Sequence, residues 1–134
     1  MPERRPDLDG ERLVDLATSQ IWVMFHGERH LVASDDVYNN LFSERERLVT
    51  AVDVNTVERG ADLEAGTCIV RPEGSGNIYL VTGSGGDVRR HYVTSFECLC
   101  DFGFDIGKTR NVPEILVRTV REGEALTSAS SRAE

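Results

Sequence analysis

Lysine is almost absent from this chain: Lys108 stands alone among fifteen basic residues, and the net charge is −8 at pH 7. A general nucleic-acid binder needs clustered Lys and Arg against the phosphates, so the acidic balance argues against a nucleic-acid partner. Long apolar runs are also missing. Residues 21–25 and 115–117 are far too short to cross a bilayer, so we expect no membrane partner. Residues 1–10 are polar and give no sign of a secretory signal.

Cysteine is scarce as well, and the three present cannot all pair within one chain. We therefore predict free thiols at Cys68, Cys98 and Cys100, made in a reducing compartment. Cys98 and Cys100 with His91 invite a metal site. However, positions i and i+2 of a helix point apart, and zinc sites usually leave two or more residues between cysteines. We predict no metal and no cofactor.

A β-hairpin pattern is present twice. Residues 78–95 show a β-rich run, a glycine loop and a second β-rich run, and residues 21–34 show an earlier version of the same pattern. Trp22 corresponds to Tyr79, and the Arg-His-Leu-Val of residues 29–32 corresponds to the Arg-His-Tyr-Val of residues 90–93. This correspondence predicts a tandem duplication.

Alternation in the first hairpin places Ile21, Val23 and Phe25 on one face and Trp22 and Met24 on the other. Both faces are apolar, so we expect this strand to be covered on both sides. The dipeptide at residues 26–27 suits a two-residue turn with glycine supplying positive φ. In the second hairpin, residues 82–87 predict a longer loop.

A serine follows each hairpin and precedes a helical pattern. Ser34 and Ser95 are good N-caps, and Gly103 is a natural residue to end the second helix. Extended, Val-rich segments at 48–57 and 106–120 then close the two units, and residues 43–47 between helix and segment look like solvated surface. The predicted fold is α+β with two tandem repeats, each a β-hairpin, a short Ser-capped helix and a closing extended segment. The expected boundaries are a flexible leader at 1–9, repeat units at 10–65 and 66–126, and a disordered tail at 127–134.

The pattern offers little for catalysis. The histidines recur after arginines, yet no acid recurs beside them to orient an imidazole. The glycines at 83, 85 and 86 lead into a strand, whereas a phosphate-binding loop needs Gly-Lys-Ser/Thr leading into a helix. An aromatic beside an arginine forms a candidate sugar or peptide platform, although aromatics in the core with arginines at its rim explain the pattern too. The candidate binding residues are Trp22, Arg29, His30, Tyr79, Arg89, Arg90 and His91; none is assigned as catalytic.

The two units resemble a recurring short module of actinobacterial phage tail and other virion proteins, and of some bacterial surface proteins. The matching residues are the aromatic strand at 78–81, the basic-aromatic strand at 89–93, Ser95, the Phe-Gly-Phe at 102–104 and the Val-Pro at 112–113. The first unit departs from the pattern, because no glycine follows Phe42 and no proline follows Val54. No catalytic residue comes with the resemblance.

Three functions follow as hypotheses. The first is a non-enzymatic virion accessory protein, a minor tail or head component made in the host cytoplasm. It would dock onto other virion proteins or form a homo-oligomer. The second is a carbohydrate or cell-wall binding module of a phage or bacterial surface protein, with host cell-wall glycan as its partner; exposed Trp22 and Tyr79 would favour it. The third is an intracellular enzyme, which needs a cleft joining His91 to Cys98 or to an acid. We favour the first, with Arg89 and Arg90 on an exposed strand edge as the docking strip.

Overall fold

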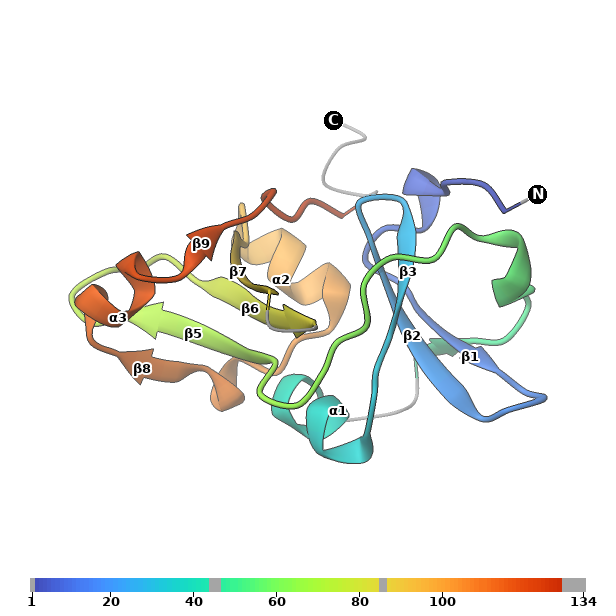
Figure 1. Ribbon diagram of the computed structural model, residues 1–134, viewed down its shortest axis with the longest axis horizontal. Coiled ribbons are helices and arrows are strands. Elements are labelled where there is room, and N and C mark those ends of the chain that lie inside the picture. Colours follow the sequence, from blue (N-terminus) through green and yellow to red (C-terminus); the bar gives the residue numbers. More distant parts are fainter. Residues whose placement is uncertain (1, 44–46, 85–86, 129–134) are drawn as a thin grey trace.

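The computed structural model describes residues 2–43, 47–84 and 87–128, and within them it contains nine strands in two sheets and three α-helices. The predicted α+β class is confirmed. Figure 1 shows the two sheets on opposite sides of the molecule, with α1 and α2 between them. No helix in this described part of the chain is long and apolar enough to cross a membrane.

The first sheet has the strand order β3-β2-β1-β4. Strands β1 to β3 are antiparallel, whereas β4 pairs with β1 in parallel after the chain has passed through α1. The bounds are β1 Arg12–Asp15, β2 Gln20–Phe25, β3 Glu28–Leu31, α1 Asp35–Leu41 and β4 Leu48–Val49, with 3₁₀ turns at Pro6–Leu8 and Val54–Thr56.

The second sheet has the order β8-β5-β6-β7-β9, in which β8 and β9 run parallel to their neighbours. The bounds are β5 Cys68–Pro72, β6 Tyr79–Ser84, β7 Asp87–Tyr92, α2 Phe96–Phe102, β8 Arg110–Val112, α3 Glu114–Arg118 and β9 Arg121–Glu122, with a 3₁₀ turn at Ile106–Lys108. In both sheets, therefore, a hairpin and the strand before it pair in the same order, and a short parallel strand follows the helix.

The sequence pattern predicted one of the two hairpin turns correctly. His26 and Gly27 have φ values of 55° and 75°, so the predicted two-residue turn is confirmed. The loop predicted at 82–87 was too long, because residues 82–84 of β6 pair with residues 87–89 of β7. Gly85 and Gly86, at its centre, lie outside the described residues.

The predicted helix caps are confirmed. The Ser34 side chain accepts a hydrogen bond from the Val37 amide at 3.3 Å, and Ser95 accepts one from the Cys98 amide at 3.0 Å. Gly103 ends α2 with φ 78°, a left-handed conformation that glycine adopts without strain. A Cβ atom there would also lie 2.8 Å from Nη2 of the buried Arg12, so the guanidinium would have to move to accept a side chain at this position.

The closing segment of the second half differs from the prediction, because α3 interrupts it. Pro113 stands immediately before the helix, where its fixed φ is compatible with helix initiation and its missing N–H costs nothing. Glu114 in the first turn and Arg118 in the last turn match the helix dipole. These local signals outweigh the β propensity of the valines.

The strand that carries Arg89 and Arg90 is not a sheet edge, so the predicted docking edge is wrong. Strand β9 pairs with β7 in parallel, with Arg89 opposite Arg121 and Arg90 opposite Glu122. Residues 59–63 follow β3 in the same manner, through bridges from Arg29 to Arg59 and from Val32 to Leu63. A partner strand cannot pair with β7 while β9 occupies that position.

The described residues of the predicted leader and tail are packed against the rest of the chain. Residues 2–9, predicted as a flexible leader, pack on the first sheet: Glu3 bridges to Val57, Leu8 contacts the apolar cluster there and Asp9 is buried. In the predicted tail, Ser128 is buried and its hydroxyl donates to Asp101 Oδ2 at 2.6 Å. Residues 129–134 lie outside the described chain, as do residues 44–46 of the segment predicted as solvated surface.

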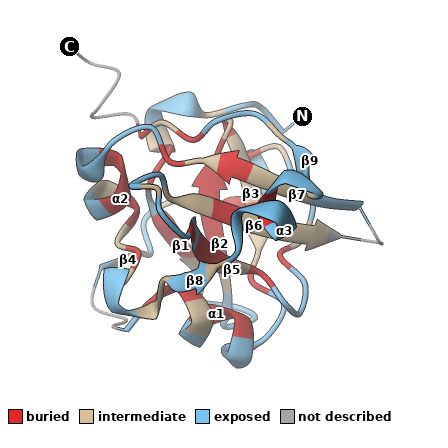
Figure 2. Cartoon of the chain, turned by 90° about the vertical axis from the view of Figure 1, so that its left-hand side faces the viewer, coloured by how far each residue is buried: buried red, intermediate tan, exposed pale blue. Residues whose placement is uncertain are grey.

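Two apolar clusters make up the core. The larger one lies between the sheets and takes residues from both, including Val23, Phe25, Ile69 and Leu80, together with one face of α1 and of α2 (Figure 2). The smaller one covers the outer face of the first sheet and contains Trp22 and Met24. The predicted alternation along β2, with both faces covered, is confirmed.

Candidate functional site

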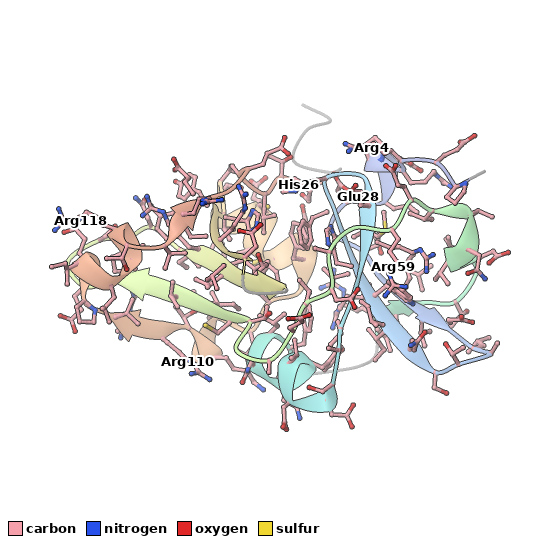
Figure 3. All side chains as sticks on the ribbon, viewed as in Figure 1. Arg4, His26, Glu28, Arg59, Arg110 and Arg118 are labelled. Carbon is pink, nitrogen blue, oxygen red and sulfur yellow. The ribbon has the colours of Figure 1, made fainter. Side chains whose placement is uncertain are left out.

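All three histidines of the chain meet where the two sheets approach each other. His26 comes from the β2–β3 turn, His30 from β3 and His91 from β7. The ring centroids of His26 and His91 lie 5.6 Å apart, and Phe25 stacks on His30 at 3.6 Å. Figure 3 shows His26 at the tip of its hairpin, on the side facing the second sheet. The site therefore joins the two halves of the molecule.

His30 and His91 make equivalent hydrogen bonds to the backbone. His30 Nδ1 lies 2.8 Å from the carbonyl oxygen of Ala61, and His91 Nδ1 lies 2.7 Å from that of Glu124. In both cases the accepting residue directly follows a glycine. A Cβ at Gly60 would lie 2.9 Å from His30 Nδ1, and one at Gly123 would lie 2.6 Å from His91 Cε1. Each glycine thus lets the returning segment reach its imidazole.

Burial keeps these two imidazoles neutral. It lowers the pKa of His30 from 6.5 to about 4, although the carbonyls of Ala61 and Phe25 partly oppose the shift. Burial also lowers the pKa of His91, against the opposing effect of the Glu124 carbonyl. A neutral imidazole carries one N–H, and we assign it to Nδ1 in both rings. In His91 this leaves Nε2 to accept from the Thr82 hydroxyl at 3.1 Å, and in His30 it serves the shorter of two carbonyl contacts, since Nε2 lies 3.2 Å from the Phe25 carbonyl oxygen. Both N–H groups therefore donate to backbone carbonyls.

The histidines line a pocket of about 190 Å³. Its wall also includes Thr82, whose hydroxyl lies 3.1 Å from His91 Nε2, and Arg89, whose Nε lies 3.1 Å from Asp87 Oδ2. Its potential bases and charges therefore already have partners within the protein. Among the described residues, no group of three or more His, Cys, Asp or Glu is arranged to hold a metal ion.

The predicted platform residue of the first half is not available to a ligand. Trp22 is 3 % exposed, and Arg29 lies over its ring at 4.3 Å, with Arg59 at 5.2 Å on the neighbouring segment. Arg29 also donates from Nε to the Val57 carbonyl at 3.0 Å. The interpretation of Trp22 as an aromatic of the core with arginines at its rim is confirmed.

Tyr79 occupies the corresponding position of the second sheet, and it is half-buried rather than buried. Its ring lies 5.7 Å from that of Tyr92 and 5.5 Å from the Arg90 guanidinium. This outer face is covered by α3, whose Val117 is buried while Leu116 remains 55 % exposed. It is therefore less completely covered than the outer face of the first sheet.

The cysteines are free thiols, as predicted. Cys98 is buried and its thiol donates to the Leu126 carbonyl, while Cys100 is exposed and Cys68 half-buried on the second sheet. Burial raises the pKa of both Cys68 and Cys98, which disfavours the reactive thiolate. Cys98 does not line the histidine pocket, so the structure forms no cleft that joins His91 to Cys98. Three acids, Glu28, Asp62 and Asp87, do line the pocket together with His91.

The seven predicted site residues divide into two groups because side chains alternate along a strand. Trp22, Arg29, Tyr79 and Arg90 lie on the outer faces of the sheets, whereas His30, Arg89 and His91 point toward the junction between them. Sequence reasoning missed His26 and Phe25 at the junction and α3 on the outer face. Gly60 and Gly123 each begin a Gly-x-Asp/Ala-Leu segment, so the two glycines recur in the sequence, but the sequence does not show that they lie against the histidines.

Comparison with known proteins gave no matching family model, no matching curated protein and no matching solved structure.

Proposed function

We propose that this chain is a non-enzymatic interaction protein that docks onto a larger protein assembly. The observation that carries the proposal is the incomplete cover on the outer face of the second sheet, where Tyr79, Val81 and Leu116 keep accessible apolar surface. The corresponding face of the first sheet is closed by the chain itself. The hydrogen-bonded imidazoles and the buried Cys98 support a protein without turnover of its own.

The setting we propose for this role is a phage virion, with the chain as a minor tail or head component. This part of the proposal depends on the resemblance of residues 78–113 to a module of virion proteins. The partners would be other virion proteins or further copies of the chain.

We also propose that the two halves are tandem copies of one module. Matching contacts support this: Ser34 and Ser95 cap their helices in the same way, and His30 and His91 each bond the residue that follows a glycine. Superposing residues 10–63 on 66–126 should align both hairpins and both helices. A residue-by-residue mismatch of the two hairpin registers would contradict the duplication.

A carbohydrate or cell-wall binding module is the alternative. Trp22 gives it no support because the side chain is buried, so the case depends on the Tyr79–Tyr92 pair. Stacking on a sugar would require the face of one of these rings to be accessible beside Arg90.

The test is to express a tagged chain in a host producing the phage that carries its gene, and to sediment the purified particles. We expect the chain in the particle fraction at a fixed ratio to the structural proteins. If it stays in the soluble fraction and instead binds purified cell-wall glycan, the carbohydrate alternative replaces the docking proposal.

Arg90→Ala should weaken docking because Arg90 lies on the outer face, whereas Arg89→Ala is the matched control because Arg89 faces the junction.

A further inference from the structure

A hollow of about 170 Å³ lies on the outer face of the second sheet, and its wall is almost entirely apolar. We call it the second-sheet groove. It is formed by strands β5 to β8 and by α3, which is largely exposed in Figure 2. The residues that line it include Val70, Val81, Arg90, Leu116, Val117 and Val120.

The same position on the first sheet is filled. There Leu13, Met24, Val54 and Val57 are buried, and Leu8 packs against them from the 3₁₀ turn at Pro6–Leu8. By strand register and helix position these four residues correspond to Val70, Val81, Val117 and Val120 of the groove. Leu8 therefore shows what kind of side chain closes this surface.

Leu8 has no counterpart in the second half, and the course of the chain explains why. The segment that precedes β5 does not return over the second sheet. Instead, residues 59–63 follow β3 of the first sheet, where the Leu63 amide donates to the Leu31 carbonyl at 2.7 Å. The second sheet consequently has α3 as its cover but lacks the apolar residue that would fill the hollow beside it.

Arg90 also lacks an interaction that its counterpart has. Arg29 donates from Nε to the Val57 carbonyl at 3.0 Å. Arg90 Nε is buried and finds no acceptor among the described residues. A buried donor without a partner is unfavourable, so a ligand that brings an oxygen to this position gains a hydrogen bond. Arg110 and Arg118, labelled in Figure 3, lie on β8 and α3 but do not line the groove: Arg110 donates to Asn40 Oδ1 at 3.4 Å, and Arg118 shares α3 with Glu114. Arg90 is therefore the cation of the groove itself.

We propose that the second-sheet groove binds a short peptide segment of a partner protein in which a leucine stands between acidic residues. Leu8 of this chain, which lies between Asp7 and Asp9, is the internal example of such a segment. The leucine fills the apolar hollow and a neighbouring carboxylate or carbonyl accepts from Arg90. This inference rests on the proposed function and identifies the surface that performs it.

The probe is the acetylated and amidated peptide Pro-Asp-Leu-Asp-Gly, copied from residues 6–10 and titrated into the isotope-labelled full chain under NMR observation. We expect saturable shifts of the signals of Val81, Leu116 and Val117. Signals of Met24 and Val54 serve as the internal control and should not move, because Leu8 already covers that surface. Replacing the leucine of the peptide by alanine should weaken binding about tenfold or more, since most of the buried apolar area is lost. Replacing both aspartates by asparagine should weaken it roughly two- to fivefold.

Two variants of the protein complete the test. Leu116→Glu places a charge in the groove at a residue that is already 55 % exposed, so the fold should be retained and peptide binding lost. Ile115→Glu is the matched control, because Ile115 is 62 % exposed on the same helix and does not line the groove. We expect Ile115→Glu to bind like the wild type.

Four results would overturn the inference: no saturable shift at millimolar peptide, equal binding of the alanine peptide, shifts of Met24 and Val54 in place of groove residues, or self-association that Leu116→Glu abolishes. The last result would mean that a second copy of the chain occupies the groove.

Sedimentation with purified particles tests the proposed function separately from this inference. If the Leu116→Glu chain still sediments with particles, the groove is not the docking surface and the function stands. If the wild type does not sediment, the function fails whatever the peptide does.

Discussion

Acid should destabilise this protein through His30 before most of its carboxylates are protonated. His30 is 5 % exposed, stacks on Phe25 and faces His26, His91 and Glu28. Its pKa is about 4 in the folded protein and 6.5 in the unfolded chain, so the unfolded chain binds the proton more readily. The stabilisation is fully present above pH 6.5 and is lost as the pH falls toward 4. Between pH 7 and pH 4.5 the loss from His30 alone is roughly 2–3 kcal/mol, a large fraction of the about 5–15 kcal/mol that stabilises a typical domain. His91 acts in the same direction.

Urea unfolding at several pH values between 7 and 4.5 measures this loss, with fluorescence of the buried Trp22 as the signal. In His30→Gln the side chain cannot take up the proton, so its free energy of unfolding should fall less steeply over the same interval, whatever its value at pH 7. The slope of unfolding free energy against urea should stay constant, which would show that the denatured state has not changed. An NMR titration of the His30 ring protons should give a midpoint near 4. If wild type and His30→Gln lose stability in parallel, or the ring titrates near 6.5, the reasoning is refuted.

Two further predictions concern the same local arrangements. Gly60→Ala and Gly123→Ala should each lower the free energy of unfolding by about 1–3 kcal/mol, because the new methyl group would overlap the imidazole ring. Thermal unfolding of both variants measures this loss. An unchanged stability would show that the imidazole can move aside without cost. A thiol reagent should modify exposed Cys100 first, half-buried Cys68 more slowly and buried Cys98 only on unfolding; fast reaction of Cys98 in the native protein would contradict its burial.

The parts of the fold that were predictable from sequence are those with short-range causes. The serine caps, the turn at His26 and the two-sided burial of β2 each follow from a few neighbouring residues. The parts that were missed depend on distant partners. Strand β9 is two residues long and forms because it pairs with β7. Residues 2–9 are ordered because Leu8 packs against an apolar surface formed by other segments. No local pattern distinguishes such a segment from a flexible one.

The histidine site illustrates the same limit in chemical terms. The recurring Arg-His pairs are visible in the sequence, and the partner expected to orient an imidazole is an acidic side chain. The structure uses a backbone carbonyl instead, from Ala61 and from Glu124. Every residue has a backbone carbonyl, so the sequence does not show which one accepts from the imidazole. The sequence shows the glycine before it, which is needed because a side chain there would occupy the space of the ring.

The two halves differ most on the outer faces of their sheets, which are the surfaces that a partner could contact. Their inner faces share one apolar core and use equivalent histidine contacts, so changes there affect stability in both halves. On the outer faces, Trp22 is buried by the chain itself, while Tyr79 and Arg90 are only half-buried, and α3 leaves a hollow beside Arg90. Burying more apolar surface on the second sheet is favourable for any ligand of suitable shape. The first sheet already buries its outer apolar surface against its own chain, so we propose the second sheet as the surface that binds a partner.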